Sequence, residues 1–117
     1  MHIDSRKQSV VDADRLDVYR VAREFDSFAV RVLPRRGCAW LRDQLLRASG
    51  SIVLNIAEGS GRFARAEKAH FYLIARGSAM ECIAVLDLAL ARGLIADADH
   101  RYGRGKLARL LQMLATS

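Results

Sequence analysis

The chain has 117 residues, of which 51% are hydrophobic and 27% charged, and its formal net charge is +6. This length suits a single domain with its own hydrophobic core, and no apolar run reaches the about 20 residues that a membrane span needs. The N-terminus carries charges at Asp4, Arg6 and Lys7 with no apolar segment after them, so we expect no signal peptide and a cytoplasmic protein.

The positive charge is unevenly distributed along the chain. Residues 1–26 hold five basic and six acidic side chains, so they sum to −1 and the rest of the chain carries +7. Most of the 19 basic residues are arginine, which suits bidentate phosphate or carboxylate contacts better than lysine does. A phosphate-bearing partner accounts for this bias, and so does a solvated surface with a GC-rich coding sequence. The sequence leaves both explanations open.

The first helix is preceded by residues 1–13, which show no steady hydrophobic period and are expected to form a mobile tail. From Asp14, a candidate N-cap, apolar residues recur at steps of three or four and predict an amphipathic helix to about Leu33. Pro34 cannot continue that helix, and residues 34–37 form the clearest turn of the sequence. We therefore expect one folded domain over residues 14–117.

The second helix is predicted over residues 38–58. Trp40 near its start is expected to pack on the first helix, and the small residues at positions 48–51 should let another helix approach closely. Gly59 and Gly61 follow the apolar pattern and are expected to end the helix by adopting positive φ angles.

The third helix, predicted over residues 64–92, has two apolar stripes on neighbouring faces. The first stripe consists of Ala66, His70, Leu73, Gly77, Met80, Ala84, Leu88 and Ala91. The second consists of Phe71, Ile74, Ile83, Leu86 and Leu90. A helix with two apolar faces usually has partners on both, so we expect contacts beyond a single bundle, in a homo-oligomer.

A fourth helix is predicted from Asp97, which is a good N-cap. Its apolar face is made of Leu107, Leu110, Leu111 and Leu114. No segment shows the alternation of a strand. Four helices joined by short loops predict an all-α protein, an antiparallel up-down four-helix bundle.

Six polar residues of the second and third helices are expected to form one cluster between them: Arg47, Asn55, Glu58, Arg62, Arg76 and Glu81. One interpretation is a site with a carboxylate pair and arginines. The other is a buried network that fixes the register of the helices, which is a recognised use of interior polar groups. No nucleophile stands obviously beside a base, so we assign no catalytic residue.

Neither a metal nor a cofactor is expected. His70 and His100 stand alone on different helices, whereas a metal site needs several converging ligands. Cys38 and Cys82 lack a metal-type spacing and are expected to be small core residues. Residues 59–62, Gly-Ser-Gly-Arg, lack the lysine and the preceding strand of a phosphate-binding P-loop.

Several segments occur together in a way that resembles a known family. They are Leu16 to Ala22 (Leu-x-Val-Tyr-x-x-Ala), Asn55 to Gly59 (Asn-Ile-Ala-Glu-Gly), Gly61-Arg62, residues 74–78 (Ile-Ala-Arg-Gly-Ser) and residues 93–95 (Gly-Leu-Ile). Over about residues 16–96 the chain is similar to the bacterial four helix bundle protein family. Its members include proteins encoded in intervening sequences of the large-subunit ribosomal RNA gene, and the accessory variability protein of diversity-generating retroelements is also similar.

The resemblance implies a non-enzymatic four-helix protomer that assembles into a ring-like homopentamer. The similar accessory variability protein is a basic pentamer that binds nucleic acid and a reverse transcriptase, which implies a nucleic-acid partner here. The chain departs from the family at the start of the third helix. There Ala64 replaces the usual serine or threonine of a capping box with Glu67, and Lys68 stands where an aromatic residue is common.

We therefore expect a basic homo-oligomer that binds RNA or DNA, with these candidate contacts: Arg35, Arg36, Arg62, Arg65, Lys68, Arg101, Arg104 and Lys106. Such phosphate contacts do not read sequence. The aromatic residues are too few to suggest a base-stacking platform: Tyr19, Trp40, Phe63 and Tyr72. An oligomeric scaffold that binds another protein is the alternative, supported by the excess of apolar helix surface. The only residues that support an enzymatic function are Glu58 and Glu81.

Overall fold

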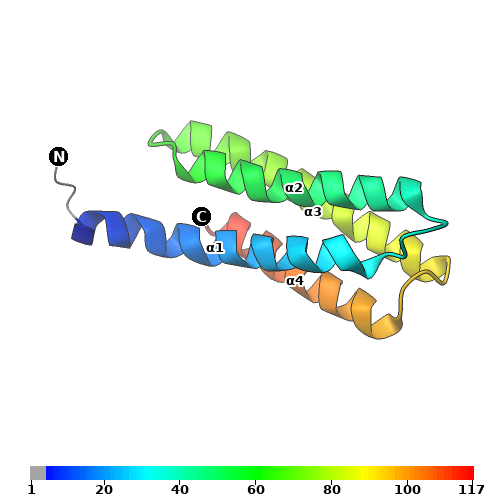
Figure 1. Cartoon of the computed structure of the whole chain (residues 1–117). Coiled ribbons are helices and arrows are strands. Elements are labelled where there is room, and N and C mark those ends of the chain that lie inside the picture. The colour runs from blue at the N-terminus through cyan, green and yellow to red at the C-terminus, as the bar shows by residue number, and fades with distance from the viewer. Residues whose placement is uncertain (1–4) are drawn as a thin grey trace.

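The structure, a computed structural model, describes the backbone of residues 5–117 and the side chains of residues 17–117. It contains four helices, α1 (Ser5–Val32), α2 (Ala39–Ser60), α3 (Arg65–Ala91) and α4 (Asp97–Ala115), and no strand within the described backbone (Figure 1). The prediction of an all-α, four-helix protein is therefore confirmed. The boundaries of α2 and α3 lie within two residues of the predicted ones.

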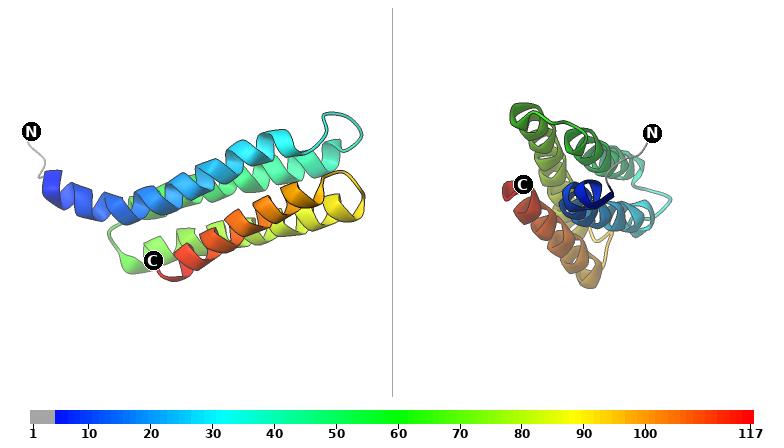
Figure 2. Two further views of the ribbon diagram at one scale, coloured as in Figure 1. Left: turned by 90° about the horizontal axis from the view of Figure 1, so that it is seen from below. Right: turned by 90° about the vertical axis from the view of Figure 1, so that its left-hand side faces the viewer.

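The helices form an elongated bundle of 52 × 24 × 23 Å in which consecutive helices run in opposite directions (Figures 1 and 2). Helices α2 and α4 each pack against α1 and α3, which are not themselves in contact in the described backbone. The α1–α2 loop (residues 33–38) and the α3–α4 loop (residues 92–96) share one end of the bundle, called here the two-loop end. The α2–α3 loop (residues 61–64) lies at the opposite end, where α4 also ends.

Helix α1 begins at Ser5 rather than at the predicted Asp14. Residues 1–4 of the expected tail lie outside the described residues, and residues 5–13 belong to the helix. A hydrophobic period reports which residues pack, whereas a nucleated helix can extend beyond its packed part because each further residue adds one backbone hydrogen bond. The missing period in this segment was therefore no evidence against a helix.

The core is built from all four helices. Its largest fully buried side chains include Phe25, Leu45, Ile52, Ile56, Leu86, Leu107 and Leu110. Cys38 and Cys82 are both free and buried, as predicted. Burial raises the pKa of the Cys82 thiol to about 12, so this thiol stays protonated and unreactive at neutral pH.

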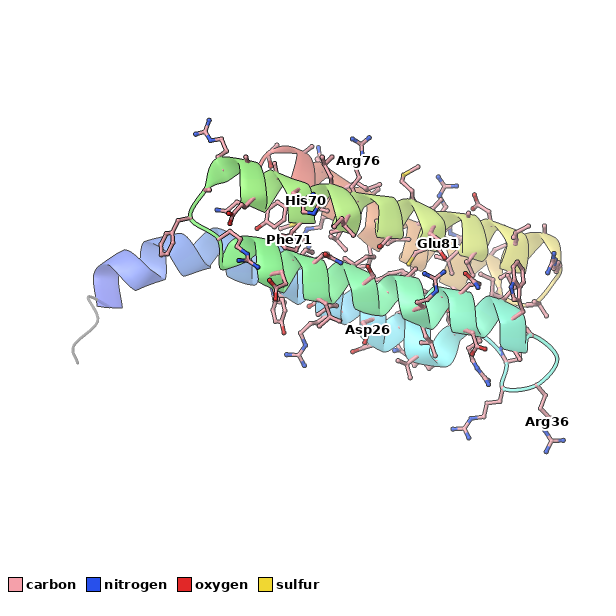
Figure 3. The ribbon with its side chains drawn as sticks, turned by 90° about the horizontal axis from the view of Figure 1, so that it is seen from above. Asp26, Arg36, His70, Phe71, Arg76 and Glu81 are labelled. Carbon is pink, nitrogen blue, oxygen red and sulfur yellow. The ribbon has the colours of Figure 1, made fainter. Side chains whose placement is uncertain are left out.

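One buried polar contact fixes α1 against α2. Ser49 is fully buried, and its Oγ donates a hydrogen bond of 2.8 Å to Oδ1 of Asp26 on α1 (Figure 3 labels Asp26). Because each group would be costly to bury alone, the pair favours one register of the two helices. Hydrophobic periodicity cannot predict such a contact, because it joins polar side chains of two different helices.

The buried face of α3 contains no residue of the first predicted stripe and shares only Leu86 with the second. It consists of Tyr72, Ala75, Ala79, Cys82, Val85, Leu86 and Ala89. All eight residues of the first predicted stripe are exposed, and we call this set the α3 stripe: Ala66, His70, Leu73, Gly77, Met80, Ala84, Leu88 and Ala91. The face that packs is rich in alanine, which lets α3 lie close to its neighbours but carries little hydrophobic signal. Larger apolar residues elsewhere on the helix therefore misled the prediction.

The glycines after the second helix do not act as predicted. Positive φ angles occur at Gly37 (86°) and Gly93 (69°), one in each loop of the two-loop end, and not at Gly59 or Gly61. Gly59 is instead a buried helical residue at a close approach, because an added Cβ would lie 2.8 Å from the Tyr72 ring. The positive φ angles predicted at Gly59 and Gly61 were therefore wrong, although Gly61 is the C-cap residue that ends α2, at φ −83°.

Asp87 ties α3 to α4. Its Oδ1 accepts hydrogen bonds from Nε2 of His100 at 2.7 Å and from Nη1 of Arg104 at 3.1 Å. The hydrogen bond from His100, together with the charge of Arg104, holds the pKa of the Asp87 carboxyl below its ordinary value. The carboxylate is 46% exposed, so the contact stabilises the fold by less than about 1 kcal/mol.

Acid should remove this contact. A carboxyl whose pKa is lowered in the folded state stabilises the fold above its ordinary pKa of 3.8, and the stabilisation is lost as pH falls through the folded value. We expect the melting temperature of Asp87→Asn to fall less than that of the unaltered protein between about pH 5 and about pH 2. Circular dichroism melts measure this difference, and identical pH dependence in the two proteins would contradict it.

Candidate nucleic-acid interface

The six residues of the predicted polar cluster do not meet in one site. Arg47 Nη2 donates to Oε2 of Glu81 at 2.6 Å and to Oε1 of Gln44 at 2.6 Å. Glu58 instead accepts a bond of 2.9 Å from Arg62, which follows it by one turn. Arg47 and Glu58 are eleven residues apart on α2, so their ion pairs lie about 16 Å apart along the helix axis.

Asn55 and Arg76 also stand apart from these pairs. The Asn55 amide donates within its own helix, to the carbonyl oxygen of Ser51 at 2.8 Å and to the Ser51 hydroxyl at 3.1 Å. Ser78 of α3 donates to the same hydroxyl at 2.8 Å, which extends the contact across the two helices. Arg76 lies on the side of α3 away from α2, whereas Glu81 lies between these helices (Figure 3).

Neither interpretation of the cluster fits these positions. The Arg47 and Glu81 side chains are 63% and 37% exposed, so their pair is not a buried network. Glu58 and Glu81 have separate arginine partners and do not form a carboxylate pair. Of these contacts, the Arg47–Glu81 pair and the Ser78–Ser51 hydrogen bond join α2 to α3. The Asn55–Ser51 and Arg62–Glu58 contacts are local to α2 and its C-terminal end.

The α2–α3 loop is held from both sides. The hydroxyl groups of Ser60 and Tyr72 lie 2.8 Å apart in a buried hydrogen bond. The Arg62 guanidinium lies 5.1 Å from the centre of the Phe71 ring, within the range of a cation–π contact. Ala64 is the N-cap residue of α3 and makes no side-chain capping bond, so the incomplete capping box predicted there is confirmed.

The eight candidate nucleic-acid contacts fall into three separate places. Arg35 and Arg36 lie in the α1–α2 loop, where Figure 3 shows Arg36 pointing away from the bundle. A second group flanks the α2–α3 loop and consists of Arg62, Arg65 and Lys68. The third group is on α4 and consists of Arg101, Arg104 and Lys106.

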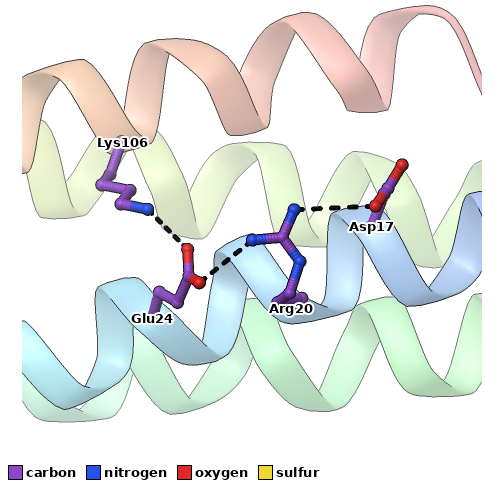
Figure 4. A network of polar contacts seen from close by, with 4 residues as sticks. All are labelled: Asp17, Arg20, Glu24 and Lys106. Atoms are coloured by element: carbon purple, nitrogen blue, oxygen red, sulfur yellow. Dashed lines mark hydrogen bonds and ion pairs between the residues drawn. The ribbon is translucent and has the colours of Figure 1, made fainter.

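Ion pairs neutralise three of these eight candidates. Arg62 binds Glu58, Arg104 binds Asp87, and Lys106 Nζ donates to Oε1 of Glu24 at 2.5 Å. The Lys106–Glu24 pair links α4 to α1 (Figure 4). Glu24 also accepts a hydrogen bond of 3.0 Å from Arg20 on its own helix. The other candidates make no ion pair with any described side chain, and they are Arg35, Arg36, Arg65, Lys68 and Arg101.

A basic cleft lies between the first half of α3 and the end of α4. Its volume is about 290 Å³, and three cations line it, namely Arg65, Lys68 and Arg76. Its apolar wall is formed by Ala69, Tyr72, Leu73, Leu114 and Ala115, and no acidic side chain is among the lining residues. Arg76 was absent from the predicted contacts because it was assigned to the polar cluster. The spacing of four from Lys68 to Arg76 through Tyr72 was the signal that places it on this face.

The α3 stripe is a separate exposed surface without charged residues. Its large apolar members, Leu73, Met80 and Leu88, are 65%, 51% and 40% exposed. An added Cβ at Gly77 would meet no atom within 4 Å, and the same holds for Gly50 on α2. Gly50 and Gly77 therefore face open space in the protomer, whereas Ala48 and Ser49 of the predicted small-residue segment are buried in its core.

The described residues contain no group of three or more histidine, cysteine, aspartate or glutamate side chains placed to hold a metal ion. None of the described helices combines the length and the hydropathy that crossing a membrane requires.

Two comparisons with known proteins agree with the fold. A family model described as 23S rRNA-intervening sequence protein matches residues 14–116. A crystal structure of a protein with unknown function from the S23 ribosomal protein family of Bacteroides thetaiotaomicron VPI-5482 is similar, with a TM-score of 0.70 and 22% identity over 94% of this chain and 96% of that one. No curated protein matches the chain. The family resemblance predicted from the sequence motifs is confirmed.

Proposed function

The chain belongs to the 23S rRNA-intervening sequence protein family. We propose that it is a non-enzymatic, homo-oligomeric accessory protein that binds the phosphate groups of a nucleic acid. The basic cleft is the observation that carries this proposal. Arg65, Lys68 and Arg76 line one concave surface, and no acidic side chain among the lining residues competes for them. Guanidinium and ammonium groups in this arrangement attract phosphates without reading the base sequence.

Self-assembly is the second part of the proposal and is supported by the α3 stripe. Eight exposed residues without a charge cover one face of α3 along nearly its whole length. A second copy of the chain is the partner we propose, with a pentamer favoured by the family resemblance. Leu73 belongs both to this stripe and to the wall of the basic cleft, so contact through the stripe would bring the clefts of neighbouring protomers together.

Assembly would multiply a weak attraction. Five copies of a chain with a formal charge of +6 carry 5 × 6 = +30. One protomer with a few phosphate contacts binds weakly at physiological salt, whereas linked sites gain avidity because the second contact becomes intramolecular. The oligomer and the nucleic-acid function are therefore proposed together.

Neutralising the basic cleft should weaken RNA binding. We expect the triple variant Arg65→Gln, Lys68→Gln, Arg76→Gln to lose at least about tenfold in affinity for a fluorescent oligoribonucleotide, and to show a shallower salt dependence, because fewer counterions are released. Fluorescence anisotropy at low salt measures both. The matched control is Arg23→Gln, Arg31→Gln, Arg109→Gln, which changes the charge equally at exposed positions outside the cleft. Equal losses in the two variants would contradict the role of the cleft.

An oligomeric scaffold for another protein is the second candidate function. The α3 stripe favours it as well, because an exposed apolar helix face suits a protein partner. The two functions differ in their response to RNA. A protein that forms oligomers but binds no RNA at low salt would be a scaffold.

A further inference from the structure

Trp40 does not lie where the sequence analysis predicted. It was expected to pack on the first helix, but Leu41 and Leu45 occupy the core at that level and the Trp40 side chain is 61% exposed. It is the only tryptophan of the chain. A large ring left in solvent at the two-loop end is available to a partner, since a tryptophan can bury up to about 250 Å².

Arginines stand close to Trp40 in the sequence. Arg35, Arg36 and Arg42 lie within five residues of it, and the nearest acidic residue is Asp43. Trp40 also lines a cleft of about 260 Å³ together with Arg92, which comes from the end of α3. The acidic residues in the first turn of α4, Asp97 and Asp99, do not line that cleft.

The loop that carries two of these arginines is held in shape. The carbonyl oxygen of Pro34 accepts a hydrogen bond from Cys38 Sγ at 3.0 Å and one from Arg42 Nη1 at 3.3 Å. Gly37 supplies the positive φ angle of 86° that the turn requires. Arg35 and Arg36 lie between these fixed points, so the positions from which they extend are set before any partner binds.

We propose that the two-loop end binds single-stranded nucleic acid, with a base stacked on Trp40 and the adjoining phosphates held by Arg35, Arg36 and Arg92. This deepens the proposed function and rests on it, since it names the form of nucleic acid and a second contact surface. An aromatic ring beside arginines is the pattern of sequence-tolerant single-strand binding. A duplex would offer no free base face to the ring, because its bases are paired and stacked.

The single tryptophan makes the test direct. Oligouridine of about 16 nucleotides should quench the intrinsic fluorescence, an abasic strand of equal length should bind with little quenching, and duplex RNA should not quench. Trp40→Ala should bind oligouridine about 5- to 150-fold more weakly, and Trp40→Phe should keep most of the affinity because its ring still stacks. Arg35→Gln with Arg36→Gln should reduce the salt dependence of oligouridine binding.

Leu54→Ala is the matched control, because Leu54 is 68% exposed on α2, outside both the basic cleft and the cleft that Trp40 lines. Its affinity for oligouridine should equal that of the unaltered protein. Oligouridine binding that survives Trp40→Ala unchanged would overturn this inference and leave the proposed function standing. A lack of any oligouridine binding at low salt would overturn both.

A third result would assign Trp40 to a protein contact. If Trp40→Ala changes the mass of the assembly measured by light scattering, the ring belongs to an interface between protomers. Single-strand stacking on Trp40 would then be wrong, whatever the effect on RNA affinity.

Discussion

A glutamate placed on the α3 stripe should separate the oligomer into monomers. We expect Leu73→Glu and Met80→Glu, made together, to give a particle of 13.0 kDa at micromolar concentration, where the unaltered protein should have a multiple of that mass. Both side chains are more than half exposed in the protomer, so the fold itself should keep its stability within about 0.5 kcal/mol. In an interface, both carboxylates would lose much of their water, and Arg76, which lies within one turn of both positions, could pair with only one of them. The unpaired carboxylate would cost several kcal/mol.

Light scattering measures the mass, and circular dichroism shows whether the protomer stays helical. Val30→Glu is the matched control, because Val30 is 59% exposed on α1, away from the stripe. The control should keep the mass of the unaltered protein. An oligomer that tolerates both stripe substitutions would place the interface elsewhere, and an unaltered protein of 13.0 kDa would remove the assembly altogether.

A methyl group at Gly59 should destabilise the protomer. The added Cβ would lie 2.8 Å from two ring carbons of Tyr72 and 3.1 Å from the Cβ of Phe71. The Tyr72 ring cannot move away from the added methyl group freely, because the Tyr72 hydroxyl is hydrogen-bonded to Ser60 in a buried contact. We expect Gly59→Ala to lower the free energy of unfolding by about 1–3 kcal/mol, although alanine is the better helix former.

Urea unfolding measures this loss, and Gly50→Ala provides the comparison. Gly50 is also inside α2, but an added Cβ there meets no atom within 4 Å. At that position we expect a gain of up to about 1 kcal/mol from helix propensity alone. Equal stability of the two alanine variants would show that the close packing of Tyr72 does not explain why position 59 is glycine.

The helices themselves could be predicted because their ends carry strong local signals. Pro34 and Gly37 separate α1 from α2, and Gly93 follows the end of α3 at positive φ. The start of α1 at Ser5 could not be read in the same way, because helix formation in that segment does not depend on a packed face. Local chemistry therefore defines boundaries better where a turn residue is present than where a helix only continues.

The faces of the helices were harder to predict than their ends. On α3 the core positions include Ala75, Ala79 and Ala89, whose small side chains look less hydrophobic than the exposed Leu73 and Met80. A hydrophobic period identifies apolar surface but does not say whether it is buried within the protomer or left for another copy. The same ambiguity affected Trp40, which was assigned to the core and is exposed.

The candidate site could be predicted in part. Arg65 and Lys68 were among the predicted contacts and line the basic cleft, together with Arg76 about two to three turns later on the same helix. Arg104 and Lys106 were also predicted, but each is paired with a carboxylate of another helix, which only the packing of α4 against α3 and α1 reveals. Ion pairs between distant segments leave no local signal in a sequence.

The salt dependence of RNA binding by the unaltered protein tests the central claim most directly. Anisotropy of a labelled oligoribonucleotide, titrated at several salt concentrations, gives the slope of the logarithm of affinity against the logarithm of salt. We predict binding at low salt and a steep negative slope, of about −0.7 for each phosphate contacted on a single strand. Absence of binding at low salt, or an affinity that does not change with salt, would contradict a nucleic-acid function based on phosphate contacts.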